Sequence, residues 1–168
     1  MLTKQDLLDK ILKSGNKFKI YEHEALYTVE DSKSLRGLIS GSHSKNLFLK
    51  NKKNHFYLFS CLEETNIDLK KLSKSLGLGN ISFANKSYLL EYLGVKPGSV
   101  TPFGLLNDIN NKVSFYLDSG FLKNQTVNFH PLTNTSTIGL NTDDFINFLI
   151  ENNKKVNIFN FNEYSIIR

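Results

Sequence analysis

The chain has 168 residues, the length of one domain, and its 40% apolar and 22% charged residues are typical of a protein with an ordinary folded core. Its net charge of +5 lies in residues 1–85, which hold 14 basic against 9 acidic side chains, and this modest excess favours a partner with a phosphate backbone. A membrane span and an internal disulfide are excluded, because no apolar run approaches about 18 residues and Cys61 is the only cysteine.

The N-terminal half is predicted to begin with an amphipathic helix and not with a cleaved leader peptide, so a cytoplasmic location is expected. Thr3 can cap this helix and Gly15 can end it. The polar sequence NKKN at 51–54 predicts a hairpin between the two strands that flank it. Strands are predicted at 18–23, 46–50, 55–62 and 81–84, and helices at 31–37, 66–79 and 85–94.

The C-terminal half begins with residues 95–108, whose prolines and glycines predict a shaped loop that leads into a short strand. A helix is predicted at 141–153, with Thr142 as its cap and acidic side chains in its first turn. Because strands outnumber helices and do not alternate strictly with them, we expect one α/β (mixed α+β) domain with a mixed, largely antiparallel sheet flanked by helices. Its further strands are predicted at 112–120, 126–132, 135–140 and 155–161.

Several common catalytic and binding motifs are absent from the sequence. It has no phosphate-binding loop, no dinucleotide-binding glycine fingerprint and no G-x-S-x-G nucleophile turn. Cys61 lies within an apolar strand, which is typical of a small core residue and not of a nucleophile. The four histidines form no pair at metal-ligand spacing, so neither a metal site nor a cofactor is expected.

Three stretches place polar groups together with glycine or proline beside strand ends, where functional sites tend to be built. The first is SKNLFL at 44–49, in which Lys45 and Asn46 precede an apolar strand. The second is GSVTPFGLLND at 98–108, and the third is FHPLTNTSTIGL at 129–140. A lysine before an apolar strand is either a solvated charge or a functional group, and its own sequence neighbours leave both interpretations open.

In this order and spacing, the three stretches resemble the trans-acting prolyl-tRNA editing superfamily, the free-standing aminoacyl-tRNA deacylases related to the insertion domain of bacterial prolyl-tRNA synthetase. They are most similar to the branch that removes alanine from mischarged Ala-tRNA(Pro), and the similarity extends over most of the chain. The resemblance implies a partly barrel-like sheet and a single editing domain over residues 1–168. It also implies hydrolysis, without a metal, of the ester at the 3′-terminal adenosine.

The resemblance further implies which residues form the site. Lys45 matches the functional lysine of the family, and His130 matches the histidine of its H-P segment. Residues 98–102 match its G-x-x-x-P loop, whereas Ser44 departs from the threonine that is common there and keeps a hydroxyl group. The candidate catalytic residues are Lys45, Gly98, Thr101 and His130, and the candidate substrate-binding residues are Asn46, Ser99, Val100 and Pro102.

Physical chemistry gives each candidate a role and an alternative. A loop shaped by glycine and proline can aim backbone N–H groups at a carbonyl oxygen, and a lysine can hold a phosphate or stabilise negative charge. His130 and Asn46 can instead form hydrogen bonds that only support the local structure. Apolar side chains that precede Lys45 either wall a pocket that admits alanine and rejects proline, or belong to the core. These side chains are Ile20, Leu26 and Val29.

The sequence therefore predicts a deacylase that hydrolyses Ala-tRNA(Pro) in trans, as proofreading of translation. Two alternatives stay open: a deacylase for another small amino acid on tRNA, such as cysteine or serine, and a non-catalytic tRNA-binding or regulatory module of the same fold. The expected partner is the acceptor end of an aminoacylated tRNA, contacted by the basic half of the chain. Prolyl-tRNA synthetase and an elongation factor are further candidate partners, and no membrane is expected.

Overall fold

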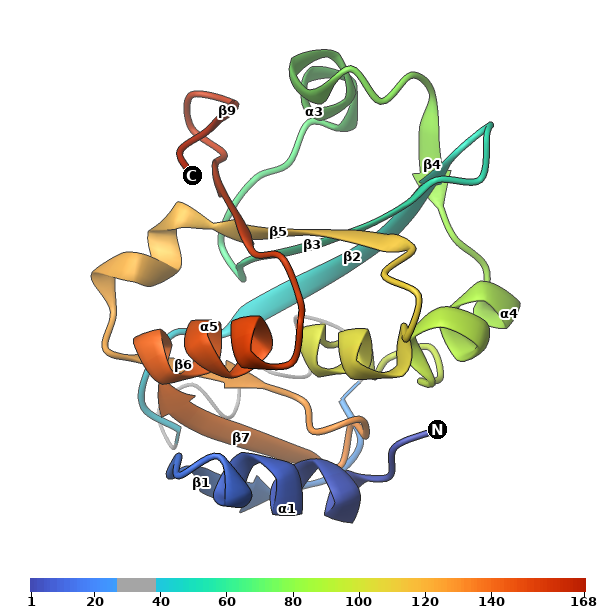
Figure 1. Ribbon diagram of the computed structural model, residues 1–168. Helices are drawn as coiled ribbons and strands as arrows, with labels where there is room; N and C mark the ends of the chain where they lie inside the picture. Colours follow the sequence, from blue (N-terminus) through green and yellow to red (C-terminus); the bar gives the residue numbers. More distant parts are fainter. Residues whose placement is uncertain (27–38) are drawn as a thin grey trace.

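Two β-sheets form the frame of the computed structural model, which describes residues 1–26 and 39–168 (Figure 1). The three-stranded sheet is antiparallel and consists, in spatial order, of β1 (Lys19–Glu22), β7 (Ser136–Asn141) and β6 (Thr126–Phe129). The six-stranded sheet consists, in spatial order, of β4 (Ile81–Phe83), β2 (Ser44–Asn51), β3 (Phe56–Leu62), β5 (Val113–Asp118), β8 (Asn157–Asn160) and β9 (Ser165–Ile166). In this sheet β5 pairs in parallel with β3 and β8, and the other pairs are antiparallel.

Helices separate and flank the sheets. In Figure 1, α5 (Thr142–Glu151) and the 3₁₀ helix η2 (Pro102–Asn107) lie between the two sheets, and α1 (Lys4–Lys13) lies beside β1 and β7. The remaining described helices are α3 (Leu69–Leu76), α4 (Lys86–Tyr88), the π-helix η1 (Leu89–Leu93) and the 3₁₀ helix η3 (Ser119–Lys123). The predicted α/β class with largely antiparallel, helix-flanked sheets is confirmed. Among the described helices, none has the length and apolar character that a membrane crossing requires.

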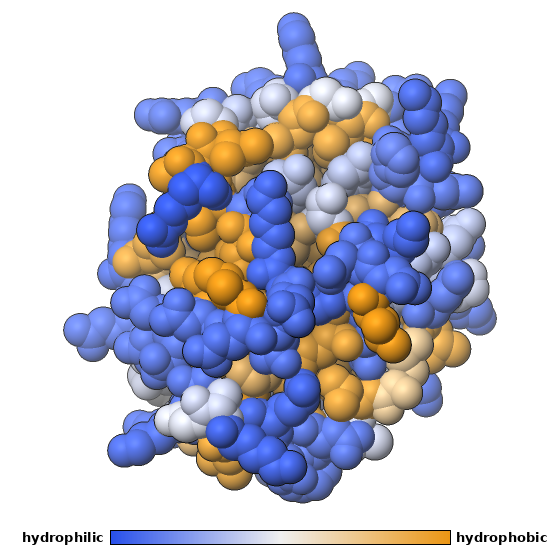
Figure 2. Space-filling model, viewed as in Figure 1, coloured by the Kyte–Doolittle hydropathy of each residue, from blue (hydrophilic) through white to orange (hydrophobic). Residues whose placement is uncertain are grey.

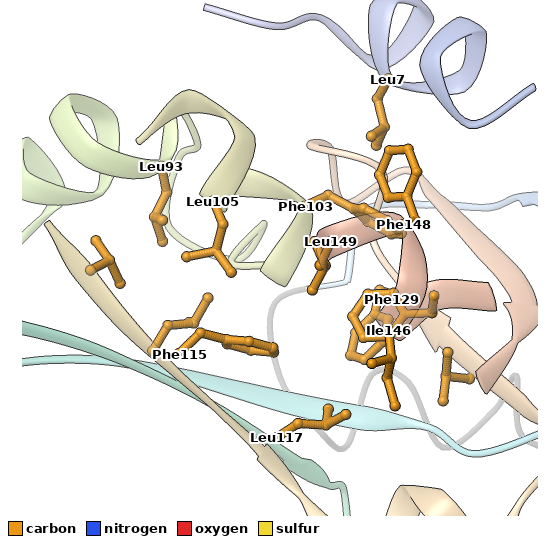
Figure 3. Packing of buried hydrophobic residues seen from close by; sticks show 14 of the residues in the cluster. Leu7, Leu93, Phe103, Leu105, Phe115, Leu117, Phe129, Ile146, Phe148 and Leu149 are labelled. Carbon is orange, nitrogen blue, oxygen red and sulfur yellow. The ribbon is translucent and has the colours of Figure 1, made fainter. Parts of the chain in front are cut away.

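Two hydrophobic cores hold these layers together. The main core lies between the two sheets, where side chains from α1, η1, η2, β5, β6 and α5 meet (Figure 3). Alternate side chains of the six-stranded sheet point into different cores, so Leu58 and Phe115 join the main core while Leu49 and Phe59 join the second. The second core is covered by α3 through Leu72. Both faces of the central strands are therefore buried.

Several predicted ends and turns are confirmed. Thr3 caps α1 in a reciprocal arrangement with Asp6, and Gly77 ends α3 with a φ of 66° that only glycine adopts without strain. β2 and β3 form the predicted hairpin in a regular antiparallel register. The predicted helix at 31–37 lies outside the described residues.

Three details differ from the sequence prediction. The segment predicted as a loop over residues 95–108 contains the 3₁₀ helix η2, because Pro102 takes its first position and the Thr101 hydroxyl accepts a hydrogen bond from Phe103 N–H, and the strand β5 follows it. Asn141, and not Thr142, caps α5. The helix predicted over 85–94 begins at its Asn85 cap as α4 but finishes as the π-helix η1.

Candidate active site

The start of β2 presents its polar side chains to two different faces of the six-stranded sheet. Ser44 is turned toward the three-stranded sheet, where its hydroxyl donates to the Asn128 carbonyl at 3.1 Å. Asn46 is two residues further on and therefore shares that face. Lys45 is half-buried and lies on the opposite face, directly across from Cys61 in β3. Neighbours in the sequence are thus separated by the pleat of the strand.

Asn46 is held in place by hydroxyl groups on both strands of the hairpin. Its side-chain oxygen accepts a short hydrogen bond from the Ser60 hydroxyl of β3, and its amide donates to the Ser44 hydroxyl at 3.5 Å. These contacts fix the orientation of the amide plane. Asn46 is consequently a positioned polar group with one amide hydrogen still available.

Asn128 joins the two sheets next to this position. Its side-chain amide donates to the carbonyls of Ser40 and Ser42, at 2.9 and 3.2 Å, and its backbone N–H donates to Ser42 as well. The side chain is 3% exposed, and its oxygen has no hydrogen-bond partner among the described residues. This role was not predicted, since Asn128 is one polar residue in an ordinary alternating strand of the sequence.

The G-x-x-x-P loop is shaped by a turn at Pro97 and Gly98. Gly98 has a φ of 89°, a backbone conformation that favours glycine, and the Ser99 N–H donates to the Lys96 carbonyl at 3.0 Å. Ser99 and the fully buried Thr101 point their side chains into the protein.

Three backbone N–H groups of the same loop have no hydrogen-bond acceptor among the described residues. The N–H groups of Gly98, Val100 and Thr101 donate to no acceptor among the described residues, whereas the N–H of Ser99 is already used in the turn. The Thr101 hydroxyl accepts from Phe103 N–H at the start of η2, and buried Pro102 has no N–H at all. The loop can therefore offer backbone donors, while its Thr101 side chain is engaged as a cap.

Aromatic packing joins this loop to the third stretch. Phe103, directly after the loop, packs its ring edge against Phe129, with ring centroids 6.2 Å apart, and also packs against Phe145 and Phe148 of α5 (Figure 3). Phe129 is the last residue of β6 and directly precedes His130. Because Asn128 binds the start of β2 and Phe129 binds the end of the loop, the three stretches meet around the end of β6.

His130 has a defined protonation state at this meeting point. Its Nδ1 lies 3.0 Å from the Ser136 carbonyl, which can only accept, so Nδ1 carries the hydrogen. Burial lowers the pKa of His130, and the nearby His23 ring, 6.3 Å away between centroids, lowers it further against the raising effect of the Ser136 carbonyl. Burial therefore favours the neutral imidazole, which keeps a lone pair on Nε2.

The segment before the undescribed residues runs along the third stretch. Ile20 of β1 is opposite Ile138 of β7 and is 39% exposed, and Leu26 exchanges backbone and side-chain hydrogen bonds with Asn134. Leu132 has a φ of 68°, a strained conformation for leucine of a kind that clusters at functional sites. Val29 lies outside the described residues.

The structure thus brings most candidates together but leaves Lys45 apart. Ser44, Asn46 and His130 are linked through residues 128–130, and Ile20 and Leu26 are linked to the same stretch. Among the described residues, no hydrogen bond or ion pair joins Lys45 to the loop or to His130. Lys45 is one residue from the start of its strand, so its flexible four-carbon stem is the part that decides where its charge lies.

In the described part of the chain, neither a reactive thiol nor a cluster of metal ligands offers an alternative catalytic site. Cys61 is fully buried, and burial raises the pKa of its thiol, an effect that Asp118 reinforces and Lys45 opposes. The thiol is therefore protonated and inert, which confirms the prediction of a core residue. No group of three histidine, cysteine or acidic side chains among these residues is placed to hold a metal ion.

Known proteins resemble this chain over most of its length. Residues 23–148 match the aminoacyl-tRNA editing domain family. The mouse prolyl-tRNA synthetase associated domain-containing protein 1 is 39% identical over 148 residues, which cover 85% of this chain and 87% of that protein. The prolyl-tRNA editing protein ProX of Acetoanaerobium sticklandii is 32% identical over 145 residues, which cover 86% and 88%. A crystal structure described as a candidate trans-editing enzyme for prolyl-tRNA synthetase shares the fold, with a TM-score of 0.68, 20% identity, and 99% and 98% coverage.

Proposed function

The chain belongs to the aminoacyl-tRNA editing domain family, and from this premise we propose that it hydrolyses, in trans, the ester that joins alanine to mischarged tRNA(Pro). The observation that carries the proposal is the meeting of the three stretches around the end of β6. It brings backbone donors, a neutral histidine and an oriented asparagine into one part of the molecule. Prolyl-tRNA synthetase is the enzyme whose error such an activity corrects.

The reaction needs a placed water and a stabilised oxyanion, because an aminoacyl ester is already activated. We assign the N–H groups of Val100 and Thr101 to the ester carbonyl oxygen, whose negative charge grows as water adds to the carbonyl carbon. Oxyanion donors of this kind contribute about 10²–10³ in rate each. The bond to the 3′ oxygen then breaks, and alanine and free tRNA are released.

His130 and Lys45 have separate tasks in this scheme. The lone pair on Nε2 of His130 takes a proton from the attacking water, directly or through the terminal 2′-hydroxyl, and returns it to the departing 3′ oxygen. Lys45 supplies a positive charge for the terminal phosphate or for the developing oxyanion. Asn46, oriented by Ser44 and Ser60, donates its remaining amide hydrogen to the ribose.

Selection of alanine follows the physics of a double sieve. A synthetase pocket built for proline rejects the smaller alanine by only about 1–3 kcal/mol, so a second pocket that excludes proline by size completes the discrimination. We assign Ile20, Leu26 and Val29 to the wall of this second pocket. Ala-tRNA(Pro) should be deacylated much faster than Pro-tRNA(Pro). Ile20→Ala should narrow this difference in rate, because the enlarged pocket would admit proline.

The contribution of the 2′-hydroxyl can be tested on the substrate itself. A tRNA(Pro) that ends in 2′-deoxyadenosine and carries alanine on its 3′ oxygen keeps every other contact. We expect its deacylation to be much slower than that of the normal substrate. Undiminished turnover would show that water is activated without this hydroxyl, and would leave His130 as the direct base.

A further inference from the structure

Two stretches of the chain are rich in lysine and contain no acidic residue. Residues 45–62 hold four lysines, residues 69–90 hold four more, and neither stretch has an aspartate or glutamate. Without Lys45, which is assigned to the site, seven lysines remain. These seven lysines, gathered in two short stretches, contribute strongly to the net charge of +5.

The fold places these two stretches side by side at one edge of the six-stranded sheet. β4 is the outermost strand and pairs with the far end of β2, so that Lys50 is opposite Ser82. The Asn51 side chain donates to the Leu78 carbonyl at 3.1 Å, which fixes the segment after α3 against the hairpin. α3 leads into this edge and α4 leads out of it (Figure 1).

Lys50 connects the hairpin loop to α4. Its ammonium group donates to the Asn54 side chain at 3.2 Å and lies 5.7 Å from the centre of the Tyr88 ring. Lys86 is two residues before Tyr88 in the same short helix, about 3 Å along its axis, so it lies near the same corner as the loop lysines. We call this surface the basic edge, and it comprises the half-buried Lys50 and the exposed Lys52, Lys53, Lys70, Lys71, Lys74 and Lys86.

Among the described residues, no ion pair joins a lysine of the basic edge to an acidic side chain, and the Asp68 carboxylate accepts from the backbone N–H groups of Lys70 and Lys71 at the start of α3. The one ion pair found in the described part of the chain joins Lys4 to Glu22, which belong to α1 and β1. Figure 2 shows a hydrophilic surface over the tip of the β2–β3 hairpin, at its upper right. α3 buries its apolar side through Leu72, so it has no free apolar face with which to enter a lipid layer.

We propose that the basic edge binds the phosphate backbone of the tRNA acceptor stem while the 3′ end occupies the site at the other end of β2. The choice of tRNA rests on the proposed function. From Lys45 to Lys52 the hairpin spans about 23 Å, at about 3.3 Å per residue. A nucleic-acid stem carries phosphates along such a length, whereas a small anion would meet only one part of it. Phe83, 61% exposed on β4, offers an apolar contact for a ribose.

The test uses two variants that remove the same charge from opposite parts of the protein. Lys52→Gln/Lys53→Gln/Lys86→Gln alters the basic edge, and Lys10→Gln/Lys13→Gln/Lys17→Gln is the control, with exposed lysines of α1 and the segment after it. Binding of uncharged tRNA(Pro) and of vesicles with anionic phospholipid is measured between about 50 and 200 mM salt.

The basic-edge variant should bind the tRNA about ten- to a hundredfold more weakly at the lower salt, and its salt dependence should lose a slope of about 3. The control should bind nearly as the unaltered protein does. Turnover of a short aminoacylated 3′ fragment should be the same for all three proteins, because the fragment does not reach the basic edge.

Equal tRNA binding by the basic-edge variant and the unaltered protein would overturn the inference. So would an equal loss in both variants, which would indicate unspecific attraction, or a loss of vesicle binding alone. Because uncharged tRNA(Pro) needs no hydrolysis to bind, an unaltered protein that binds through the basic edge without deacylating Ala-tRNA(Pro) would contradict the proposed function and support this inference.

Discussion

At the scale of single residues, Lys45 and Asn46 illustrate what adjacent positions in a strand can and cannot share. The two are neighbours in the sequence, but the pleat of β2 turns Asn46 toward the three-stranded sheet and Lys45 toward Cys61. This separation was not visible in the sequence, because Leu47, Phe48 and Leu49 are all apolar and both faces of the strand are buried. Lys45 as a functional residue stays a prediction from the resemblance.

Removal of the Lys45 charge tests that prediction. Lys45→Ala should lower the rate of Ala-tRNA(Pro) deacylation at least about tenfold, since a charge-assisted contact contributes about 1.5–3 kcal/mol. Its thermal unfolding should stay close to that of the unaltered protein, because Lys45 makes no ion pair among the described residues. The control is Lys123→Ala, at an exposed lysine in η3. Near-normal deacylation by Lys45→Ala would remove Lys45 from the site.

His130 gives a prediction on pH. Burial holds its pKa below the ordinary value of 6.5, so the rate should stay level above that pH and fall only as the pH drops through the lowered pKa. Protonation there converts Nε2 from an acceptor to a donor. The unfolded chain binds this proton more readily, so the free energy of unfolding should also decrease as the pH falls below about 6.5.

The matching variant is His130→Asn, with His55→Asn at an exposed histidine as the control. His130→Asn should lose about a hundredfold in rate and also lose the decline at low pH. His55→Asn should keep both. If the decline at low pH survives in His130→Asn, another group is the base and His130 only supports the structure.

At the scale of elements, η2 shows why glycine and proline residues predicted an irregular segment but not the 3₁₀ helix within it. Glycine and proline at 97–104 marked a shaped segment, but they are compatible with several continuations. The combination of Thr101 as a cap with Pro102 at the first position accounts for the start of a helix here. The π-helix η1 was equally hidden, since its apolar spacing resembles that of an α-helix and its register is set by packing.

Phe103 anchors η2 and thereby the loop before it. Its fully buried ring packs against Phe129, Phe145 and Phe148, so Phe103→Ala should lower the free energy of unfolding by about 3–5 kcal/mol in urea titrations. The control is Phe83→Ala, at a ring that is 61% exposed, which should cost under about 0.5 kcal/mol. A small effect of Phe103→Ala would mean that the loop does not depend on this contact.

Asn107 fixes the other end of η2. Its side-chain amide donates to the Leu93 carbonyl at 2.9 Å, and its oxygen accepts from the Leu2 N–H at 2.8 Å. Asn107→Asp keeps the acceptor but removes the donor, so it should lower the free energy of unfolding by about 1–3 kcal/mol. In native-state hydrogen exchange, the substitution should speed the opening of η1 and η2 relative to the unaltered protein. It should not speed the opening of α3, which has no contact with Asn107. If the substitution left the exchange rates of η1 and η2 unchanged, or changed those of all helices equally, Asn107 would not be the residue that fixes this end of η2.

At the scale of the whole molecule, local patterns predicted most elements and the fold class, but not their arrangement. Capping residues such as Thr3 and Asn85 act within a few residues, so they can be recognised from the sequence, whereas the cap of α3, Asp68, was not predicted. The parallel pairs of β5 with β3 and β8 join distant segments, and the division into two sheets depends on packing across the main core. The resemblance to the prolyl-tRNA editing superfamily is confirmed by the family match and by the similarity to ProX.

The rate of Ala-tRNA(Pro) hydrolysis by the purified chain, compared with Ser-tRNA and Cys-tRNA(Pro) and corrected for spontaneous loss of the ester, tests the central claim most directly. The account predicts turnover that is fastest on Ala-tRNA(Pro) and at least about tenfold slower with Lys45→Ala. Faster turnover of Cys-tRNA(Pro) or Ser-tRNA would contradict the assignment to alanine. Tight tRNA binding without hydrolysis of any of the three esters would contradict catalysis itself and indicate a binding module of the same fold.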